Sequence, residues 1–318
     1  MTEKISKLEN TILELEQRIH KLKDNPAQVD SSIEIKKLEE QKKNLQKEVY
    51  SNLSPYEIVK ISRHNLRPTI SDYINLMFDD FIELHGDRCF GDDKTIITGL
   101  GKIGSKKALI IGHQKGKTTK ERIQCNFGMP NPEGYRKALH KMKLAEKFHL
   151  PIVSLIDTPG ANPDIGAEER GQAHAIAFNI AEMSRLRTPI ICIVVGEGGS
   201  GGALGIGVGD KFSILEFAYC SVISPEGCAA ILWKSKDNAE EASTALKLTA
   251  NDLYELKIVD EIIPEPIGAA HSNPEEMAKI LKKIIVRYIE ELQEIPIDKL
   301  IENRYKKYRK FGSFLGGE

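Results

Sequence analysis

A run of fourteen residues, Gly196–Gly209, contains eight glycines and follows directly on an apolar segment, Pro189–Val195. The apolar segment has the length and composition of a buried β-strand. Glycines gather in this way where the backbone must adopt positive φ values or approach another group closely. If the strand turns into a helix here, the first N–H groups of that helix have no acceptor within it and can stabilise a negatively charged oxygen. The sequence therefore predicts an anion-stabilising backbone turn at the end of this strand.

Composition argues against several other classes of function. The chain has 318 residues, a formal net charge of −1, 41% apolar residues and 29% charged residues. These values are ordinary for a globular protein and predict neither a nucleic-acid surface nor a membrane surface. Its apolar runs are far too short to cross a bilayer. The five cysteines include no C-x-x-C pair and the eight histidines no H-x-x-x-H or H-E-x-x-H motif, so we expect reduced thiols, a cytoplasmic protein and no metal site.

The first fifty-two residues differ from the rest of the chain. Apolar residues from Ile5 to Leu22 repeat at alternating spacings of three and four, and a second seam of this kind lies between Ile35 and Val49. The spacing is the a/d pattern of helices that pack lengthwise on another helix. Because helices of this length are marginal alone in water, we expect residues 1–52 to form an N-terminal helical hairpin that serves packing or oligomerisation.

From residue 53 onward, short apolar segments alternate with helical patterns. Such alternation predicts an α/β domain with a mostly parallel sheet covered by helices. We assign residues 53–295 to this domain and residues 296–318 to a basic C-terminal tail that is solvated or bound by a partner. The segments expected as strands are 106–111, 151–156, 189–195, 211–215, 220–223 and 258–263, and those expected as helices are 133–149, 168–187 and 274–292.

Three loops resemble nucleotide-binding motifs and leave an alternative function open. Gly196–Gly201 fits the G-x-G-x-x-G pattern of dinucleotide-binding proteins, with Glu216 about twenty residues later. The later glycines of the same run oppose the long helix that should follow, since each costs about 1 kcal/mol in a helix interior. Gly112–Thr118 has one residue too few for a Walker A loop, and Asp157–Gly160 resembles a GTPase switch segment without a downstream Asn-Lys-x-Asp motif. An NAD-dependent dehydrogenase or a GTPase is therefore the alternative interpretation.

The sequence offers little evidence for a catalytic nucleophile or a general base. Ser200 lies between glycines, but an esterase needs an acid and a histidine later in the chain, and Asp260 and His271 fit that role only with difficulty. We interpret His271 as a surface histidine in a segment rich in proline and glycine. The predicted chemical groups of the site are thus main-chain donors rather than titratable side chains.

The chain also contains eight longer strings, each far more specific than a glycine pattern: Gly112–Gly116, Asn126–Pro130, Pro132–Ala138, Ile156–Ala161, Gly166–Gln172, Gly196–Gly209, Ser221–Cys228 and Ile231–Lys234. Together they resemble the family of carboxyltransferase alpha subunits of bacterial acetyl-CoA carboxylase. The likeness extends from the N-terminal hairpin to about residue 290. One departure is Asn162, where relatives often carry an aromatic residue, and it bears on the local wall of the pocket.

This resemblance implies an α/β fold of the crotonase-like type, a ββα superhelix, preceded by the N-terminal helical hairpin. Members of that superfamily use pairs of backbone N–H groups to hold an oxygen that becomes negatively charged. Matched position by position, the resemblance places the oxyanion hole of the alpha subunit at the N–H groups of Gly201 and Gly202, where it would bind the ureido oxygen of biotin. The supporting loop residues are Gly160, Ala161, Gly198, Gly199 and Ser200.

The same resemblance implies an enzyme that transfers a carboxyl group from carboxybiotin, presented by the biotin carboxyl carrier protein, to acetyl-CoA. The product would be malonyl-CoA, in the first committed step of fatty acid biosynthesis. The beta subunit would hold the thioester oxygen of acetyl-CoA, and the ureido nitrogen of biotin would take the methyl proton, so that no protein base is required. The implied partners are the beta subunit, in an α2β2 assembly, and the biotin carboxylase, which uses ATP.

Overall fold

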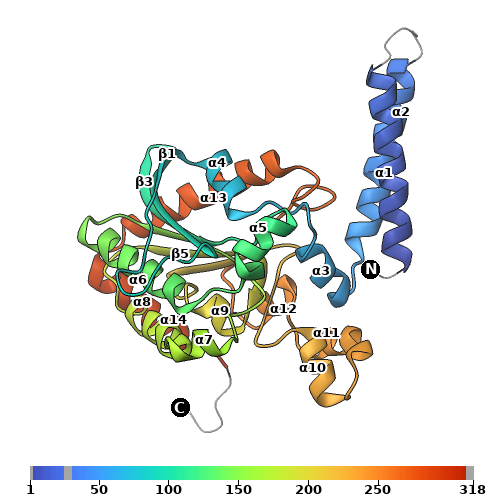
Figure 1. Cartoon of the computed structure of the whole chain (residues 1–318). Coiled ribbons are helices and arrows are strands. Elements are labelled where there is room, and N and C mark those ends of the chain that lie inside the picture. Colours follow the sequence, from blue (N-terminus) through green and yellow to red (C-terminus); the bar gives the residue numbers. More distant parts are fainter. Residues whose placement is uncertain (1–2, 25–30, 313–318) are drawn as a thin grey trace.

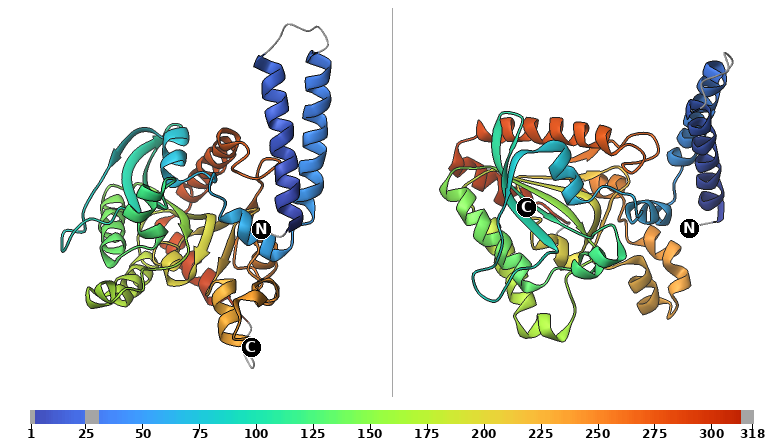
Figure 2. Two further views of the ribbon diagram at one scale, coloured as in Figure 1. Left: turned by 45° about the vertical axis from the view of Figure 1, so that its right-hand side comes forward. Right: turned by 45° about the horizontal axis from the view of Figure 1, so that its top comes forward.

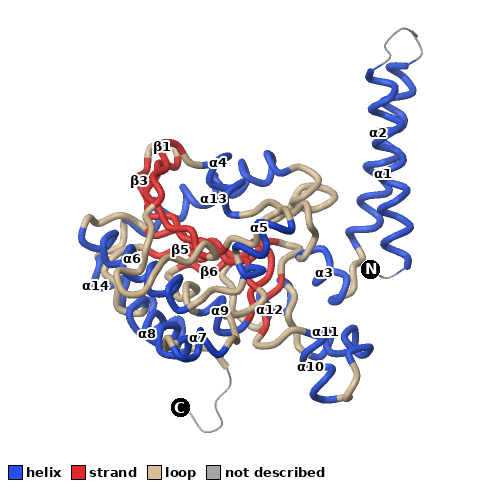
Figure 3. Tube along the Cα trace, viewed as in Figure 1, coloured by secondary structure: helices blue, strands red, loops and turns tan. Residues whose placement is uncertain are grey.

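The computed structural model describes residues 3–24 and 31–312, and its centre is one eight-stranded β-sheet. The strands are β1 (Asp79–Glu83), β2 (Ile96–Ile103), β3 (Lys106–His113), β4 (Ile152–Thr158), β5 (Ile190–Gly199), β6 (Lys211–Leu215), β7 (Tyr219–Ser221) and β8 (Glu261–Ile263). Their order is β1-β2-β3-β4-β5-β6-β8, with β7 paired to the end of β5. The first three strands are antiparallel, whereas β3, β4, β5, β6 and β8 run parallel. Figure 3 shows the strands crossing the middle of the molecule with helices around them.

Six of these strands are those expected from the sequence, but β1 and β2 were not predicted. β2 contains two glycines, which weaken the apolar pattern of a strand and usually mark a close approach of another group. A Cβ atom at Gly99 would lie 2.4 Å from the ring of Phe81 on β1. A Cβ atom at Gly101 would lie 3.3 Å from Ile110 on β3. These glycines therefore let β2 pack closely between its neighbours. They also interrupt the apolar pattern from which a strand is predicted.

Helices cover both faces of the sheet. α4 (Ile70–Met77) and α13 (Pro274–Gln293) lie on one side, and α6 (Pro132–Lys147) and α8 (Gln172–Met183) lie on the other (Figures 1 and 2). Within the described residues, no helix has the length and apolar character needed to cross a membrane. The remaining helices of the domain are α3 (Pro55–Ser62), α5 (Thr119–Gln124), η1 (Asn126–Gly128), α7 (Ile165–Glu169), α9 (Ser200–Leu204), α10 (Pro225–Leu232), η2 (Lys236–Asn238), α11 (Ala239–Ala245), α12 (Ala250–Glu255) and α14 (Ile297–Arg309).

The helix expected over residues 168–187 is divided in two. Gly171, with φ of 84°, separates α7 from α8. This is the left-handed region of backbone conformation, which only glycine adopts without a steric cost. The predicted helix therefore contains a turn that reorients α8.

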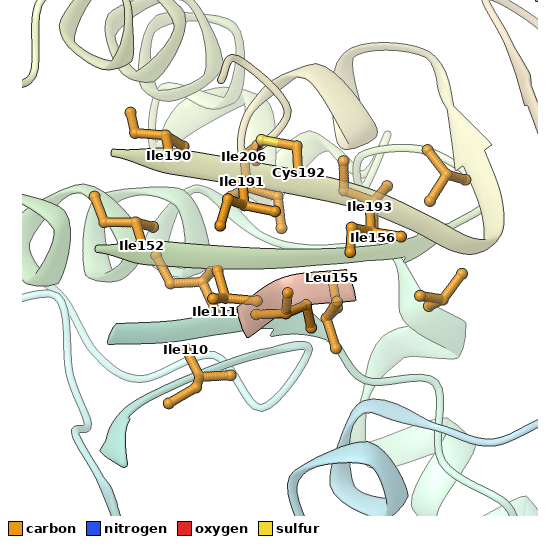
Figure 4. Close-up of a cluster of buried hydrophobic side chains, with 14 of the residues drawn as sticks. Ile110, Ile111, Ile152, Leu155, Ile156, Ile190, Ile191, Cys192, Ile193 and Ile206 are labelled. Carbon is orange, nitrogen blue, oxygen red and sulfur yellow. Dashed lines mark hydrogen bonds between the residues drawn. The ribbon is translucent and has the colours of Figure 1, made fainter. Parts of the chain in front are cut away.

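The core is formed by the parallel strands and is rich in isoleucine. Every residue of β4 and β5 is buried, as expected for strands with helices on both faces. Figure 4 shows side chains of β3, β4 and β5, including Ile110, Ile152 and Ile191, in contact across neighbouring strands. This packing holds the carboxyl ends of the three strands, and the loops that follow them, in a fixed arrangement.

The N-terminal residues form the expected pair of helices. α1 (Glu3–Asp24) and α2 (Ser31–Ser51) run antiparallel and project from the sheet domain (Figures 1 and 2). Ile12 and Ile19 of α1 and Leu38 of α2 are buried, in agreement with the predicted seams. The side chains of residues 1–10, and residues 25–30 between the helices, lie outside the described part of the chain.

The expectation of a solvated C-terminal tail is wrong for residues 297–309. This segment is the helix α14, and its Arg304 is 1% exposed. The Arg304 guanidinium donates to both carboxylate oxygens of Asp210, at 2.8 and 2.7 Å, and to the backbone oxygens of Met183, Leu186 and Thr188. A buried guanidinium needs such partners, so α14 is docked on the domain through the face that carries Leu300 and Arg304. Residues 313–318 lie outside the described part of the chain.

Candidate active site

The predicted turn lies at the end of β5, where the strand passes directly into the short helix α9. Ser200, the first residue of α9, has φ of 45°, which is unusual for a residue other than glycine. The N–H groups of residues 200–202 occupy the first turn of the helix, and N–H groups at this position have no acceptor inside it. Ser200 is exposed and Gly201 is partly exposed, whereas Gly202 is buried. The turn thus presents main-chain donors at the carboxyl edge of the parallel sheet.

A second backbone segment, the loop after β4, lies against this turn. A Cβ atom at Gly202 would lie 2.5 Å from the carbonyl carbon of Gly160 and 2.7 Å from the nitrogen of Ala161. A Cβ atom at Gly199 would lie 2.2 Å from the carbonyl oxygen of Pro159. Glycine is required at 199 and 202 because two backbones touch there. This is the close approach to another group that the run of glycines indicated.

The loop after β4 is itself fixed by side chains. The hydroxyl of Thr158 donates to the carbonyl oxygen of Gly128 at 2.6 Å, and it accepts from the N–H of Gly160 at 3.1 Å. Asn162, the departure from the family pattern, is 6% exposed, and its side-chain N–H donates to Asn131 at 2.8 Å. The residue therefore has a structural role in the loop, where its amide group bonds the preceding segment.

The structure brings all the predicted site residues together. Gly198 lies on β5 beside β7, and a Cβ atom there would lie 2.8 Å from the sulfur of Cys220. The later glycines of the run pack against the core, as Gly205 does against the ring of Tyr135, where a Cβ atom would lie 2.4 Å from a ring carbon. α9 ends at Leu204, so it is not the long helix that a dinucleotide-binding unit would have. Gly198 and Gly205 thus serve close packing, as Gly199 and Gly202 do.

A network of charged side chains that the sequence analysis did not single out lies beside the turn. Lys115 Nζ lies 2.6 Å from Asp157 Oδ1 and 2.7 Å from Glu197 Oε2. Arg63 Nε lies 2.6 Å from Glu197 Oε1, and the other guanidinium nitrogens of Arg63 contact Glu226 and Tyr219. The network joins the carboxyl ends of β3, β4 and β5 to helices α3 and α10.

Burial and pairing set the charges of this network. Burial alone would raise the pKa of Glu197, but Lys115 and Arg63 outweigh it and lower that pKa to about 2. Burial opposes the charge of Lys115, yet Asp157 and Glu197 raise the pKa of its ammonium group. Glu197 and Lys115 are therefore ionised at neutral pH and bound to each other, so we assign them to holding the loops rather than to proton transfer.

The sequence carried a signal for this network. Lys115, Asp157 and Glu197 each follow or end a different strand of the parallel set. The carboxyl ends of neighbouring parallel strands meet at one edge of a sheet. Opposite charges at three such ends could therefore have been paired before the structure was known.

The esterase arrangement considered for Ser200 is not assembled. Asp260 accepts from the N–H of Phe212 at 2.7 Å and pairs with Lys307, at the amino end of β6. His271 stacks on His64 with 4.0 Å between ring centroids, and burial lowers its pKa to about 3. The acid thus lies at the edge of the sheet opposite to Ser200. Among the described residues there is also no group of three or more histidines, cysteines or carboxylates that could hold a metal ion.

Comparison with known proteins identifies the family. A family model described as acetyl co-enzyme A carboxylase carboxyltransferase-like matches residues 5–312. The chain belongs to this family. It is 52% identical over 310 residues to the acetyl-coenzyme A carboxylase carboxyl transferase subunit alpha of Rhodopirellula baltica, covering 96% of this chain and 97% of the relative. It is 54% identical over 310 residues to the subunit of the same name from Methylococcus capsulatus, covering 96% of each.

Solved structures support the fold of this carboxyltransferase chain. A chain of the 12S transcarboxylase hexamer core, with methylmalonyl-coenzyme A bound, superposes with a TM-score of 0.55 at 19% identity. The superposition covers 70% of this chain and 42% of that chain. The beta subunit of Pseudomonas aeruginosa geranyl-CoA carboxylase gives a TM-score of 0.55 at 15% identity, over 77% of this chain and 46% of that one. The expected crotonase-like α/β fold is thereby confirmed.

The nucleotide-enzyme alternative is not supported. The family match spans both the Gly112–Thr118 loop and the Gly196–Gly201 turn on which that alternative depended. Lys117, the lysine that a Walker A loop would direct at phosphates, is paired with Asp72 at 2.6 Å. The chain is therefore a carboxyltransferase alpha subunit, a transferase, and its similarity to nucleotide-binding loops is incidental.

Proposed function

We propose that this chain, as the alpha subunit of the carboxyltransferase of acetyl-CoA carboxylase, transfers a carboxyl group from carboxybiotin to acetyl-CoA and forms malonyl-CoA, the first committed step of fatty acid biosynthesis. The carrying observation is the turn of partly exposed Gly201 and buried Gly202, whose N–H groups begin a helix at the carboxyl edge of the sheet. The full-length likeness to acetyl-coenzyme A carboxylase alpha subunits supports the choice of reaction.

The residues of the turn fit a biotin ureido group. Its oxygen is an acceptor, and the N–H groups of Gly201 and Gly202 are paired donors in the first turn of α9. Biotin supplies the carboxyl group in this reaction. The two N–H groups would donate to the ureido oxygen as its negative charge increases, and such a preorganised donor contributes about 10²–10³ in rate.

The surrounding backbone gives these donors their orientation. The contact of Gly202 with Gly160 and Ala161 leaves α9 no freedom to move toward the loop. Residues 198–204 contain no titratable side chain. The contribution of this segment is therefore binding and charge stabilisation by main-chain groups, with Gly198, Gly199 and Ser200 shaping the turn.

We propose that the active assembly contains a separate beta subunit, as α2β2, and works with the biotin carboxyl carrier protein and a biotin carboxylase that uses ATP. Apolar side chains exposed on three helices of the domain support coverage by a partner. Ile165 on α7 is 78% exposed, Leu204 on α9 is 49% exposed, and Leu232 on α10 is 64% exposed. Residues 1–52 would act as an assembly hairpin on the domain 53–295. All five cysteines are free, which supports the reducing cytoplasm as the site of action.

Reconstitution tests this proposal. The purified chain alone should form no malonyl-CoA from acetyl-CoA and carboxylated biotin carrier, and addition of a beta subunit should give turnover. Full turnover without the beta subunit, or none with it, would overturn the proposal. Calorimetric titration with NAD and GTP gives an independent comparison, in which we expect no binding heat.

A further inference from the structure

We propose that two carboxamide side chains on helix α8, Gln172 and Asn179, are positioning residues that fix the Gly201–Gly202 turn against the Gly160–Asn162 loop. Neither touches the turn's exposed face, so both act through the backbone segments that they hold. The inference rests on the proposed function, because it concerns how accurately the turn's N–H groups are aimed.

Gln172 holds the loop after β4. It is the first residue of α8 and is 4% exposed. Its Nε2 donates to the carbonyl oxygen of Pro130 at 2.8 Å and to that of Asn162 at 2.9 Å. One side chain therefore ties the far end of the Gly160–Asn162 loop to α8.

Asn179 holds the other segment. It is 1% exposed, and its Nδ2 donates at 2.9 Å both to the carbonyl oxygen of Gly205, which caps α9, and to that of Tyr135 on α6. Asn179 follows Gln172 by seven residues, so the two side chains leave the same face of α8 two turns apart. Helix α8 contacts both α6 and α9 (Figure 1). The helix thus holds the loop with one carboxamide and the turn with the other.

The use of both amide protons is unambiguous. Each NH2 group faces two backbone carbonyl oxygens, so exchanging its nitrogen and oxygen would place acceptor against acceptor. The remaining oxygens, Gln172 Oε1 and Asn179 Oδ1, are buried and have no hydrogen-bond partner. A buried polar atom without a partner is unfavourable and calls for an explanation. If each side chain is required to donate to two backbone segments, its oxygen is left without a donor. This requirement explains the unpaired oxygens of both Gln172 and Asn179.

The consequence concerns the distance between the two segments. Gly202 already lies in backbone contact with Gly160 and Ala161. If α8 loses its hydrogen bonds to either segment, Gly202 still contacts Gly160 and Ala161. The orientation of α9 relative to the loop, however, is no longer fixed. A displacement of about 1 Å in a reacting geometry can cost about 10²-fold in rate.

The test uses isosteric substitutions in the full-length chain, assembled with its beta subunit. Asn179→Asp and Gln172→Glu each replace two donors by a carboxylate that faces carbonyl oxygens. We expect kcat for malonyl-CoA formation to fall about 10- to 100-fold, with the KM for acetyl-CoA unchanged. Asn303→Asp on α14 and Gln293→Glu on α13 make the same chemical changes at exposed positions, and these controls should retain wild-type kcat.

Thermal unfolding and co-elution with the beta subunit show whether each variant folds and assembles. If Asn179→Asp fails to assemble, Asn179→Ser, which keeps a donor and adds no charge, replaces it, with Asn303→Ser as control and a loss of kcat again expected. Wild-type kcat in the assembled variants, or a rise in KM equal to the fall in kcat, would overturn the inference. Failure of the proposed function is distinguished by the wild-type complex, which would then form no malonyl-CoA.

Discussion

Substitution of two adjacent glycines by alanine should have opposite outcomes. At Gly202 an added methyl group would lie 2.5 Å from the carbonyl carbon of Gly160 and 2.7 Å from the nitrogen of Ala161. The first distance is about 0.9 Å short of the 3.4 Å of an ordinary contact. Because both neighbours are backbone atoms, no rotamer change relieves the clash, and α9 or the loop must move by about 1 Å. At Gly201 the methyl group would lie 3.6 Å from the side chain of Ile176, which is an ordinary contact.

We therefore expect Gly202→Ala to lower kcat of the assembled carboxyltransferase by about 10²-fold, since a shift of this size misdirects the donors. Overpacking should also lower the free energy of unfolding by about 1–3 kcal/mol. Gly201→Ala should keep kcat within about threefold of wild type, because it preserves the N–H group and its methyl group makes only an ordinary contact. Stability should not fall, because alanine is favoured in helices by about 1 kcal/mol. Steady-state malonyl-CoA formation and urea unfolding measure both variants. Equal activity of the two variants, at either level, would refute the reasoning.

Three further outcomes follow from buried polar groups. Glu197→Gln should weaken the fall in the free energy of unfolding between about pH 4.5 and pH 2. A carboxyl group whose pKa is lowered to about 2 in the folded state stabilises the fold above its unfolded pKa and loses that effect as the pH falls. Urea unfolding across this pH range measures the difference. Arg304→Leu should cost about 3–5 kcal/mol in chemical unfolding, because it leaves the carboxylate of Asp210, 4% exposed, without its buried partner. Tyr135→Phe should lower kcat a few-fold, since the Tyr135 hydroxyl donates to the carbonyl oxygen of Gly202 at 3.4 Å. Tyr73→Phe is the control: the buried Tyr73 hydroxyl has no hydrogen-bond partner, so this variant should keep both kcat and stability unchanged.

The parallel part of the fold could be predicted because its strands are buried on both faces. β6 was expected with its observed bounds, and β3, β4 and β5 to within four residues at either end. β2 escaped because close packing required Gly99 and Gly101 in its interior. α14 escaped for another reason, since charge pattern alone does not show that Arg304 has a buried partner ninety-four residues away. A pairing between residues so far apart in the sequence can be recognised only when the fold is known.

The site could be predicted in its position but only partly in its physical basis. The end of a buried strand and a run of glycines located the turn, and the resemblance to a family named Gly201 and Gly202. The contact between Gly202 and Gly160 required coordinates, because nothing in either segment indicates that the other lies beside it. The carboxamides Gln172 and Asn179 required them too, since amide side chains on a helix are ordinarily solvated. The hydrogen-bond donors could therefore be predicted from the sequence, whereas the groups that orient them could be identified only in the structure.

The central claim is that the N–H groups of Gly201 and Gly202 hold the biotin oxygen that becomes negatively charged. A crystal structure of the assembled carboxyltransferase with biotinylated carrier bound tests it most directly. The measured quantity is the distance from the ureido oxygen to each of the two backbone nitrogens. We expect both distances to be about 2.7–3.1 Å, the range of oxyanion-hole donors. A ureido group bound elsewhere, or either N–H group donating to a protein acceptor in that complex, would contradict the account.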